Sequence, residues 1–481
     1  MFPILLLLLP IVSALVLLAL PGSISKRVAL VGSILSLVMV LYALNTLRFD
    51  AASANLVYNQ IWLSSLGSNL SFSIDGITMV LLLLTNILMP LIILSTFNRE
   101  IHKPKAYLTF MLFMQSALVG VFMATDGLVF YIFWELALIP IYFICLFWGG
   151  EGRQRITFKF FIYTLLGSLF MLVALIILYQ HTTNHSFAIS DLYAAGKSMT
   201  FEQQAWVFWF FFLAFAIKMP VFPFHTWQPD TYTNAPTQGT MLLSGIMLKM
   251  GTYGLIRWLL PMVPEAVSAY SNTVIILSII SVVYASCIAI VQTSFKRLIA
   301  YSSIAHVGLI CAGIFSYKAE GIQGALVQMF AHGVNVVGLF FVCDIIQRNA
   351  GTDTIANLGG IRSVNQRFAF WFLVIMLGSV ALPLTNSFVG EFLLLNGIYQ
   401  YNVWYAAIGG LTIILGAVYM FRSYQAIMLG TTSGNTLMFA SLKKSETLVF
   451  VFIVFIIMVC GIYPKIILDI SALDVLKMIM H

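Results

Sequence analysis

The feature that most constrains this chain is a series of fourteen apolar runs, each close to the length of a membrane-spanning helix. A helix needs about 20 apolar residues to cross the hydrocarbon core of a bilayer. The runs lie near 3–20, 28–46, 77–96, 106–123, 127–148, 158–180, 205–228, 238–260, 272–292, 298–316, 322–345, 368–400, 404–428 and 446–469. Hydrophobic residues make up 61% of the 481 residues and charged residues 9%, which excludes an ordinary soluble protein. The sequence therefore predicts an all-α polytopic membrane protein with about fourteen transmembrane helices.

Basic residues are distributed unevenly between the predicted loops. Loops after odd-numbered runs hold fifteen Lys and Arg residues, and loops after even-numbered runs hold three. Because basic loops stay on the cytoplasmic side, we expect both termini on the periplasmic side of a bacterial inner membrane. Lys26 and Arg27 follow the first run and no basic residue precedes it, which favours a retained helix over a signal peptide. The net charge of +7 forms no continuous patch, so we expect no nucleic-acid partner.

Two runs are interrupted by proline. Pro220 and Pro223 lie in the seventh run, and Pro383 lies in the twelfth beside Thr385-Asn386-Ser387. Since proline lacks an N–H, backbone carbonyls are freed, near Ala216 and Met219 in the seventh run. Broken helices of this kind are typical of ion-translocating proteins built from inverted repeats. We expect two inverted five-helix repeats, helices 4–8 and 9–13, with helices 7 and 12 broken. The corresponding segments are 1–100, 101–262, 263–430 and 431–481.

Glu135 and Lys218 are charged residues inside apolar runs. An ionisable side chain at membrane depth is expensive and normally faces a protein interior or a wet cavity with a partner. Alone, Glu135 would be a neutral acid bonded to backbone, and Lys218 a snorkelling lysine beside a proline kink. As partners, both stay charged, with an attraction on the order of 4 kcal/mol. Separating them would let Lys218 give up its proton, so the pair is predicted to be a switch.

Four more ionisable residues lie in the middle of apolar runs: Lys249, His306, His332 and Glu391. Either histidine alone could be a satisfied core residue, and Lys249 could snorkel. Together they alternate base, imidazole and acid, and an imidazole can accept on one nitrogen while donating from the other. The row therefore indicates a proton path, whereas sodium would need several oxygen ligands in one place. The supporting groups are expected to be His225, Asp230, Ser302 and Ser303, where His225 lines an entrance or bonds a freed carbonyl.

The chain contains no dinucleotide fingerprint, Walker loop or metal-binding motif. Its five cysteines lie in apolar runs without C-x-x-C spacing, as packing residues do. We therefore expect no cofactor or metal in this chain.

The motifs around these charges resemble the antiporter-like membrane subunits of respiratory complex I, the NADH-quinone oxidoreductase. The resemblance runs from about 70 to 470 and rests on the motifs at 133–135, 218–227, 235–237, 248–251, 300–308, 331–333 and 388–392. It implies a proton-pumping subunit of the membrane arm, in which Glu135 pairs with Lys218 and Lys249 connects two half-channels. It places His306 and His332 on the central axis and Glu391 on the exit side.

The resemblance also implies partners and cofactors outside this chain. FMN, iron–sulfur clusters and quinone are expected in partner subunits of a peripheral redox arm, with two related antiporter-like subunits and lipids around this one. Three residues depart from the family pattern: Tyr232 where histidine is usual, Asn234 where glutamate is usual, and Ser294 where aspartate is usual. They bear on the proton entry route or a surface contact and not on the central path.

Two other functions fit parts of the pattern. A subunit of a multisubunit cation/proton antiporter or of a membrane-bound hydrogenase would share the ancestry, but the paired motifs and Glu391 favour complex I. A purely structural membrane spacer would have no need for buried charges, which are costly to keep.

Overall fold

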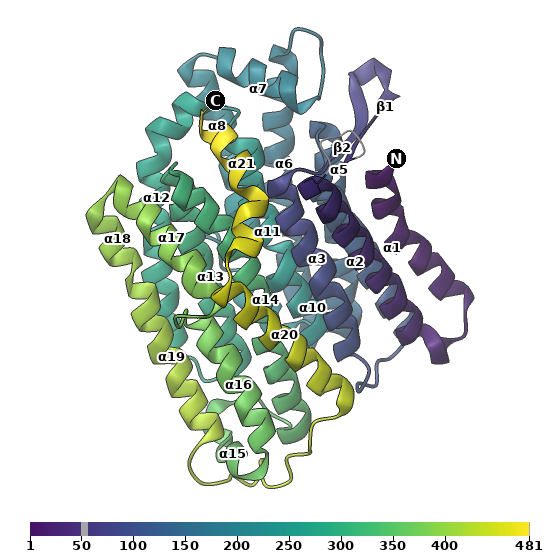
Figure 1. The fold of residues 1–481 in the computed structure, drawn as a ribbon, viewed down its shortest axis with the longest axis vertical. Helices are drawn as coiled ribbons and strands as arrows, with labels where there is room; N and C mark the ends of the chain where they lie inside the picture. The colour runs from purple at the N-terminus through teal and green to yellow at the C-terminus, as the bar shows by residue number, and fades with distance from the viewer. Residues whose placement is uncertain (50–55, 481) are drawn as a thin grey trace.

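The computed structural model describes residues 1–49 and 56–480 of the chain, and it is a bundle of long helices (Figure 1). Met1 and the end of the last helix lie toward the same end of the bundle, as an even number of crossings requires. The long uninterrupted helices are α1 Phe2–Ala19, α2 Ser25–Phe49, α3 Gly76–Ser95, α4 Pro104–Met123, α5 Gly127–Trp148, α6 Arg153–His181, α12 Pro264–Ile290, α13 Phe295–Phe315, α14 Ala319–Ala350 and α20 Lys444–Ile462.

The other helical segments are shorter or interrupted. They are α7 Ile189–Ser198, α8 Phe201–Lys218, α9 Gln228–Asn234, α10 Thr237–Leu242, α11 Lys249–Gly254, α15 Ile361–Val364, α16 Gln366–Ser379, α17 Asn386–Tyr401, α18 Val403–Gly409, α19 Leu411–Met428 and α21 Lys465–Met480, with short 3₁₀ turns at Gly22–Ile24, Ser64–Leu66 and Ile355–Asn357. The predicted all-α polytopic class is confirmed, with one two-stranded hairpin added to it.

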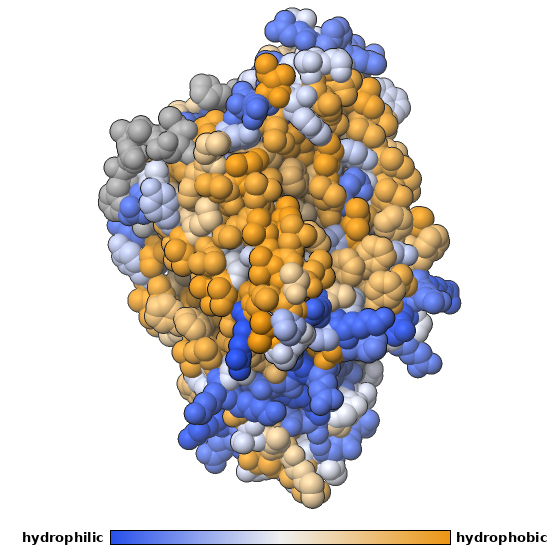
Figure 2. All heavy atoms as spheres, turned by 90° about the vertical axis from the view of Figure 1, so that its right-hand side faces the viewer, coloured by the Kyte–Doolittle hydropathy of each residue, from blue (hydrophilic) through white to orange (hydrophobic). Residues whose placement is uncertain are grey.

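Eleven of the described helical spans are long and apolar enough to cross a membrane. The other three runs of the sequence, 205–228, 238–260 and 368–400, correspond to interrupted helical segments. The surface is apolar over the middle of the molecule, and polar residues gather toward its ends (Figure 2). The chain is therefore a multi-pass membrane protein, whereas the exact number of crossings and the repeat relation stay predictions.

The predicted break at Pro220 and Pro223 is present. Helix α8 ends at Lys218, and a series of turns leads to α9. The carbonyl of Ala216 accepts from the N–H of Val221 at 3.1 Å, and the carbonyl of Ile217 accepts from Trp227 Nε1 at 2.9 Å. Because two of the carbonyls left by the prolines find donors inside the protein, non-helical backbone is tolerated at membrane depth.

The predicted break in the twelfth run is also present, between α16 and α17. Asn335 of α14 bridges it, because its Nδ2 lies 3.0 Å from the carbonyl of Gly378, 3.0 Å from Asn386 Oδ1 and 2.8 Å from Ser387 Oγ. One side-chain amide thus contacts a backbone carbonyl at the end of α16 and two side-chain oxygens at the start of α17.

The eighth run differs from the plain helix that its composition predicts. Two π-helical turns, Leu243–Met247 (η4) and Leu255–Leu259 (η5), enclose the short helix α11. In the first of them the N–H of Leu248 donates to the carbonyl of Leu243, five residues earlier, at 3.0 Å. Such π-bulges widen a helix locally and are frequent at functional sites. Lys249 is the residue that begins α11.

The last predicted run, 446–469, is two helices rather than one. Helix α20 ends at Ile462, and α21 begins at Lys465 directly after Pro464 and continues to Met480. The proline has no N–H to extend the α20 ladder, which explains the break.

The segments 56–75 and 181–204 lie over one end of the bundle (Figure 1). Residues 50–55 lie outside the described part. Strands β1 Val57–Leu63 and β2 Ser68–Ser73 form an antiparallel hairpin (Figure 1). Asp126 joins the hairpin to α5, because its carboxylate accepts from Ser68 Oγ, from the N–H of Asn69 and from two N–H groups of the first turn of α5. Helix α14 lies at the core of the bundle, because its apolar stretch is entirely buried.

Candidate functional site

The centre of the site is a contact between Lys249 and His332. The Lys249 ammonium donates to the carbonyl of Ser244 at 2.6 Å and lies 2.9 Å from His332 Nδ1. Lys249 is fully buried and His332 nearly so. Because the ammonium has only protons to offer, Nδ1 is the acceptor, and the ring proton of the neutral imidazole then lies on Nε2. The π turn η4 contains Ser244, so the widened helix provides one ligand of the buried cation.

The two histidines and Glu391 continue the line across three helices. The ring centroids of His306, on α13, and His332, on α14, are 5.7 Å apart. His306 Nδ1 lies 3.0 Å from Glu391 Oε1 of α17, although not in the direction of a good hydrogen bond. Gln328 Nε2 donates to the same carboxylate oxygen at 3.1 Å. The sequence-predicted residues Lys249, His332, His306 and Glu391 are therefore brought together in this order.

A small cavity lies beside the two histidines. Its volume is about 10 Å³, which is room for roughly one water. Ser302, Ser303, Gln328 and Asn335 contribute to its lining. Among the described residues, five polar atoms of the cavity lining have no hydrogen-bond partner: Ser303 Oγ, His306 Nδ1, Gln328 Oε1, His332 Nε2 and Asn335 Oδ1. Buried polar atoms are normally satisfied, so the arrangement fits an ordered water between the histidines.

The predicted serines have different positions. Ser303 faces the cavity, as a relay group would, whereas Ser302 Oγ lies 2.9 Å from the hydroxyl of Tyr419. Tyr419, on α19, is itself buried. Ser302 therefore ties the line to a neighbouring helix.

Glu135 and Lys218 are close but do not touch. The described residues include no ion pair between them within 4 Å, although each side chain lies in the electrostatic field of the other. Lys218 is buried at the end of α8, and its ammonium lies 5.3 Å from the centre of the Trp134 ring. Glu135, which follows Trp134 on α5, has Ser168 beside it. One of its carboxylate oxygens has no hydrogen bond in the described part. Both side chains are thus held near each other without being locked together.

The structure places two predicted supporting residues away from this line. Asp230 is half-buried and forms ion pairs with Lys159 at 3.0 Å and with Arg297 at 3.2 Å, so it joins α6, α9 and α13. His225 stacks near Phe222 and Tyr284 in the first break, and its Nδ1 has no partner among the described residues. His225 was one candidate donor to a carbonyl freed by the break. Trp227 Nε1 donates to the freed carbonyl of Ile217 instead.

The three departures from the family pattern lie near the same end of the bundle as Asp230. Asn234 Nδ2 donates to the carbonyl of Glu151 at 2.6 Å. Ser294 caps α13 by accepting from the N–H of Arg297 and donates to the Asp353 carboxylate, which also accepts from the N–H of Lys296. Tyr232 is buried between Trp227 and Phe340. None of them contacts the four-residue line in the described part.

Sequence analysis missed three uncharged members of the site: Gln328, Asn335 and Tyr419. Gln328 and Asn335 lie four residues before and three residues after His332 on one helix, and such spacing places them on the same face. That spacing was the available signal. Tyr419 had none, since only the fold brings α19 to α13. Within residues 1–49 and 56–480, no three His, Cys, Asp or Glu side chains gather closely enough to hold a metal ion.

Comparison with known proteins gives one family over most of the chain. Residues 124–416 match the family described as NADH:quinone oxidoreductase/Mrp antiporter, TM. The chain is 40% identical over 451 residues to NADH-quinone oxidoreductase subunit M of Rickettsia typhi, covering 93% of this chain and 90% of that protein. It is 36% identical over 485 residues to NADH-ubiquinone oxidoreductase chain 4 of Arabidopsis thaliana, covering 99% and 96%.

Two solved structures are similar over almost their whole length. One is a chain of respiratory complex I from Thermus thermophilus with bound NADH, with a TM-score of 0.90, 30% identity and full coverage of both chains. The other is a chain of a membrane-bound sulfane sulfur reductase, an archaeal respiratory membrane complex, with a TM-score of 0.89, 21% identity and 99% coverage of both. At that identity the second likeness concerns the fold alone.

Proposed function

Because the chain belongs to the NADH:quinone oxidoreductase/Mrp antiporter membrane family, we propose that it is a proton-translocating subunit in the membrane arm of an NADH:quinone oxidoreductase. The resemblance drawn from the sequence motifs is confirmed, including the likeness to chain M, since the relatives from Rickettsia are named subunit M. The observation that carries the proposal is the buried line of Lys249, His332, His306 and Glu391, which crosses four helical segments in close succession.

The line can pass a proton in discrete steps. A proton from the Lys249 ammonium goes to His332 Nδ1, and the proton on Nε2 leaves toward the small cavity. Water there hands a proton to His306, and the imidazole passes one to Glu391 across the 3.0 Å contact. Each imidazole accepts and donates on different nitrogens, so it must turn or exchange protons with water before the next passage. Lys249, now neutral, is then able to take up a proton again.

Glu135 and Lys218 provide the step that can be switched. Opposite unit charges a few ångströms apart attract by on the order of 4 kcal/mol at the effective dielectric of a protein, and about 1.4 kcal/mol changes a protonation equilibrium tenfold. A displacement of either side chain therefore changes how firmly the buried lysine holds its proton. The broken helix at Pro220 and Pro223 directly follows Lys218, so movement of the break would change this distance.

The assembly partners follow from the family. Other subunits of the complex surround this chain in the membrane arm, including the two related antiporter-like subunits, and lipid covers the remaining apolar surface. FMN, iron–sulfur clusters and quinone belong to partner subunits, and this chain contributes the proton path of the enzyme. Lys and Arg placement favours a bacterial inner membrane with both termini in the periplasm.

A subunit of a multisubunit cation/proton antiporter or of a membrane-bound hydrogenase is the second candidate, because the family description also names the Mrp antiporter. The whole-length identity to NADH-quinone oxidoreductase subunits favours the first candidate.

Purification through a tag on this chain separates the two candidates. Extraction in mild detergent is expected to yield an assembly with flavin and iron–sulfur absorbance that reduces quinone with NADH. An eluate of small membrane subunits that exchanges sodium for protons, without redox centres, would contradict the proposal.

A further inference from the structure

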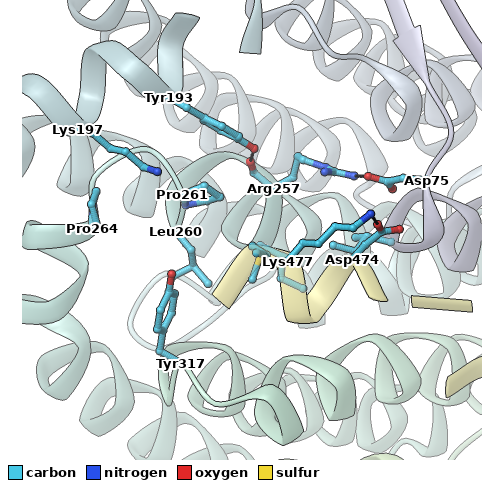
Figure 3. A pocket seen from close by; sticks show the side chains of 13 residues that line it. Asp75, Tyr193, Lys197, Arg257, Leu260, Pro261, Pro264, Tyr317, Asp474 and Lys477 are labelled. Carbon is cyan, nitrogen blue, oxygen red and sulfur yellow. Dashed lines mark hydrogen bonds and ion pairs between the residues drawn. The ribbon is translucent and has the colours of Figure 1, made fainter. Parts of the chain in front are cut away.

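A second polar region lies apart from the line, at the end of the bundle that carries α7 and the hairpin. It is a pocket of about 430 Å³ between the start of α3, the end of η5, α7 and α21. Asp75, Tyr193, Arg257, Asp474 and Lys477 contribute to its wall (Figure 3). The sequence predicts this end of the molecule to be the outer one.

An ion pair forms one side of the pocket. The guanidinium of Arg257 contacts the carboxylate of Asp75, and the two side chains point toward each other (Figure 3). Asp75 also caps α3 by accepting from the N–H of Thr78 at 2.9 Å. The hydroxyl of Tyr193 donates to the backbone carbonyl of Arg257 and fixes that turn of the helix. The pair is partly buried, with side-chain exposures of 21% for Arg257 and 30% for Asp75.

Hydrogen bonds extend from this pair into the protein. Arg257 Nη2 donates to Thr78 Oγ1 at 3.4 Å, and Thr78 Oγ1 donates to the carbonyl of Phe122 at 3.1 Å. The hydroxyl of Tyr253 donates to the same carbonyl at 2.8 Å. Tyr253 lies midway in sequence between Lys249 and Arg257, at the end of α11 and directly before the π turn η5 that contains Arg257. At no more than about 1.5 Å per residue, Lys249 and Arg257 are at most about 12 Å apart along the axis.

Tyr253, Thr78, Arg257 and Asp75 form a polar stripe, and the line that ends at Glu391 does not use it. Buried ionic and hydroxyl groups are costly, and an apolar stripe of the same shape would be more stable. The stripe leads from the central lysine to an open pocket. An arginine in such a passage is an electrostatic barrier to protons, and a carboxylate beside it is a proton acceptor.

We propose that the pocket is an outer water vestibule and that the Asp75–Arg257 ion pair is the gate between it and Lys249. The inference rests on the proposed function and adds a second outer connection to it. A proton that leaves the Lys249 ammonium, which becomes a neutral amine, passes along water beside Tyr253 to the Asp75 carboxylate. The carboxylic acid so formed releases the proton to water in the pocket and is ionised again. Arg257 keeps protons from returning while it is paired.

The test uses the whole complex in proteoliposomes, with proton-to-electron ratio and passive proton leak as readouts. Asp75→Asn keeps the cap of α3, since asparagine caps as well as aspartate, but removes the acceptor and leaves Arg257 unpaired. Its ratio is expected to fall below the wild-type value but to stay above that of Lys249→Met, because the line to Glu391 remains intact, and no added leak is expected. Arg257→Gln removes the barrier and is expected to raise the leak at least about tenfold, the effect of about 1.4 kcal/mol. If the ion pair were merely structural, both variants would lose stability alike. The ratio would then not fall selectively in Asp75→Asn, and the leak would not rise selectively in Arg257→Gln.

Asp469→Asn is the matched control, because this carboxylate is exposed on the same helix, α21, and does not line the pocket. Its ratio and leak are expected to equal the wild-type values. A wild-type ratio in Asp75→Asn, with Lys249→Met defective, overturns the gate and leaves the proposed function intact. Normal pumping in Lys249→Met overturns the proposed function itself. If Arg257→Gln does not assemble, the ratio of Asp75→Asn decides alone.

Discussion

The two halves of the buried charged line are built differently around the same device, a broken helix. In the second half, Lys249 lies 2.9 Å from His332, the two histidine rings are 5.7 Å apart, and His306 lies 3.0 Å from Glu391. Asn335 bridges the break between α16 and α17 through its side-chain amide. In the first half, Glu135 and Lys218 make no contact within 4 Å in the described structure. The break in the first half is held by a backbone hydrogen bond to Ala216 and by Trp227, and neither hydrogen bond involves a charged side chain.

This difference assigns different work to the halves. A chain of contacts transfers protons with small side-chain rotations, whereas a loose pair of opposite charges changes its energy strongly with distance. The first half is therefore suited to sense a conformational change, and the second half is suited to conduct. A mutation that affects sensing and one that affects conduction should be distinguishable.

Lys218→Met is expected to have the largest effect, because it removes the cation of the loose pair while preserving length and apolar packing. Proton pumping should fall by more than about tenfold, because the variant has no titratable group at the step that the pair is proposed to switch. Proteoliposome pumping with NADH as the donor measures this. Lys444→Met, at an exposed lysine in the first turn of α20, is the control and should pump normally. An assembled Lys218→Met complex with full pumping would show that the first half senses nothing.

Double-mutant cycles on stability compare the contacts of the two halves directly. His306→Ala combined with Glu391→Gln should show a coupling free energy of about 1 kcal/mol, typical of a buried polar contact between helices. Glu135→Gln combined with Lys218→Met should show less than about 0.5 kcal/mol in the resting state, as for side chains that do not touch. Denaturation of the purified complex by detergent gives these values. Equal couplings would remove the distinction between the halves.

The two breaks should also differ when their ties are cut. Asn335→Leu removes contacts to both α16 and α17, and it should lower stability and pumping together. Trp227→Phe leaves only the Ile217 carbonyl without its donor, at a cost of about 1–3 kcal/mol, and should lower stability while pumping stays close to normal. Trp206→Phe, at an exposed tryptophan on α8, serves as the control. Strong loss of pumping in Trp227→Phe at normal stability would place the first break on the conduction path.

The smallest expected effect is a pH dependence of stability outside the membrane. Burial acts to raise the pKa of the Asp75 carboxyl, but the Arg257 guanidinium and the Thr78 N–H outweigh it and hold that pKa below its usual value. Asp75 therefore stabilises the fold above about pH 4 and loses this contribution as the pH falls through its folded pKa. Between pH 6 and pH 3, the thermal midpoint of the wild type should fall by about 1 °C more than that of Asp75→Asn. Equal slopes would mean that the ion pair adds no stability.

The charged line was predictable because ionisable residues are rare inside apolar runs. Lysine, glutamate and histidine stand out inside apolar runs, and prolines mark the breaks, so the two interruptions and the residues Lys249, His306, His332 and Glu391 could be anticipated. The order in which the two histidines follow Lys249 comes only from the fold. The direct pairing of Glu135 with Lys218 could not be decided, because side-chain separation depends on how α5 and α8 pack. Asp230 looked like a member of the path, but Lys159 and Arg297 take both of its oxygens, and only the fold brings them there.

Uncharged members of the site were harder to identify. Gln328, Asn335 and Tyr419 are unremarkable in a helical membrane protein, where polar residues also bond their own backbone. The π turns on either side of α11 have no local sequence signal, and in the fold η4 packs against α14 and η5 against α8. The hairpin near α7 is likewise visible only as a polar stretch between two runs.

The most direct measurement of the central claim is the proton-to-electron ratio of the reconstituted complex carrying Lys249→Met. Lys249 is the first residue of the connected line, and its methionine variant keeps the volume but has no proton to give to His332. The account predicts an assembled complex with normal flavin-dependent NADH oxidation and a ratio lowered by the whole share of this chain. A wild-type ratio in that complex would contradict the account, because protons would then cross without the residue on which the line depends.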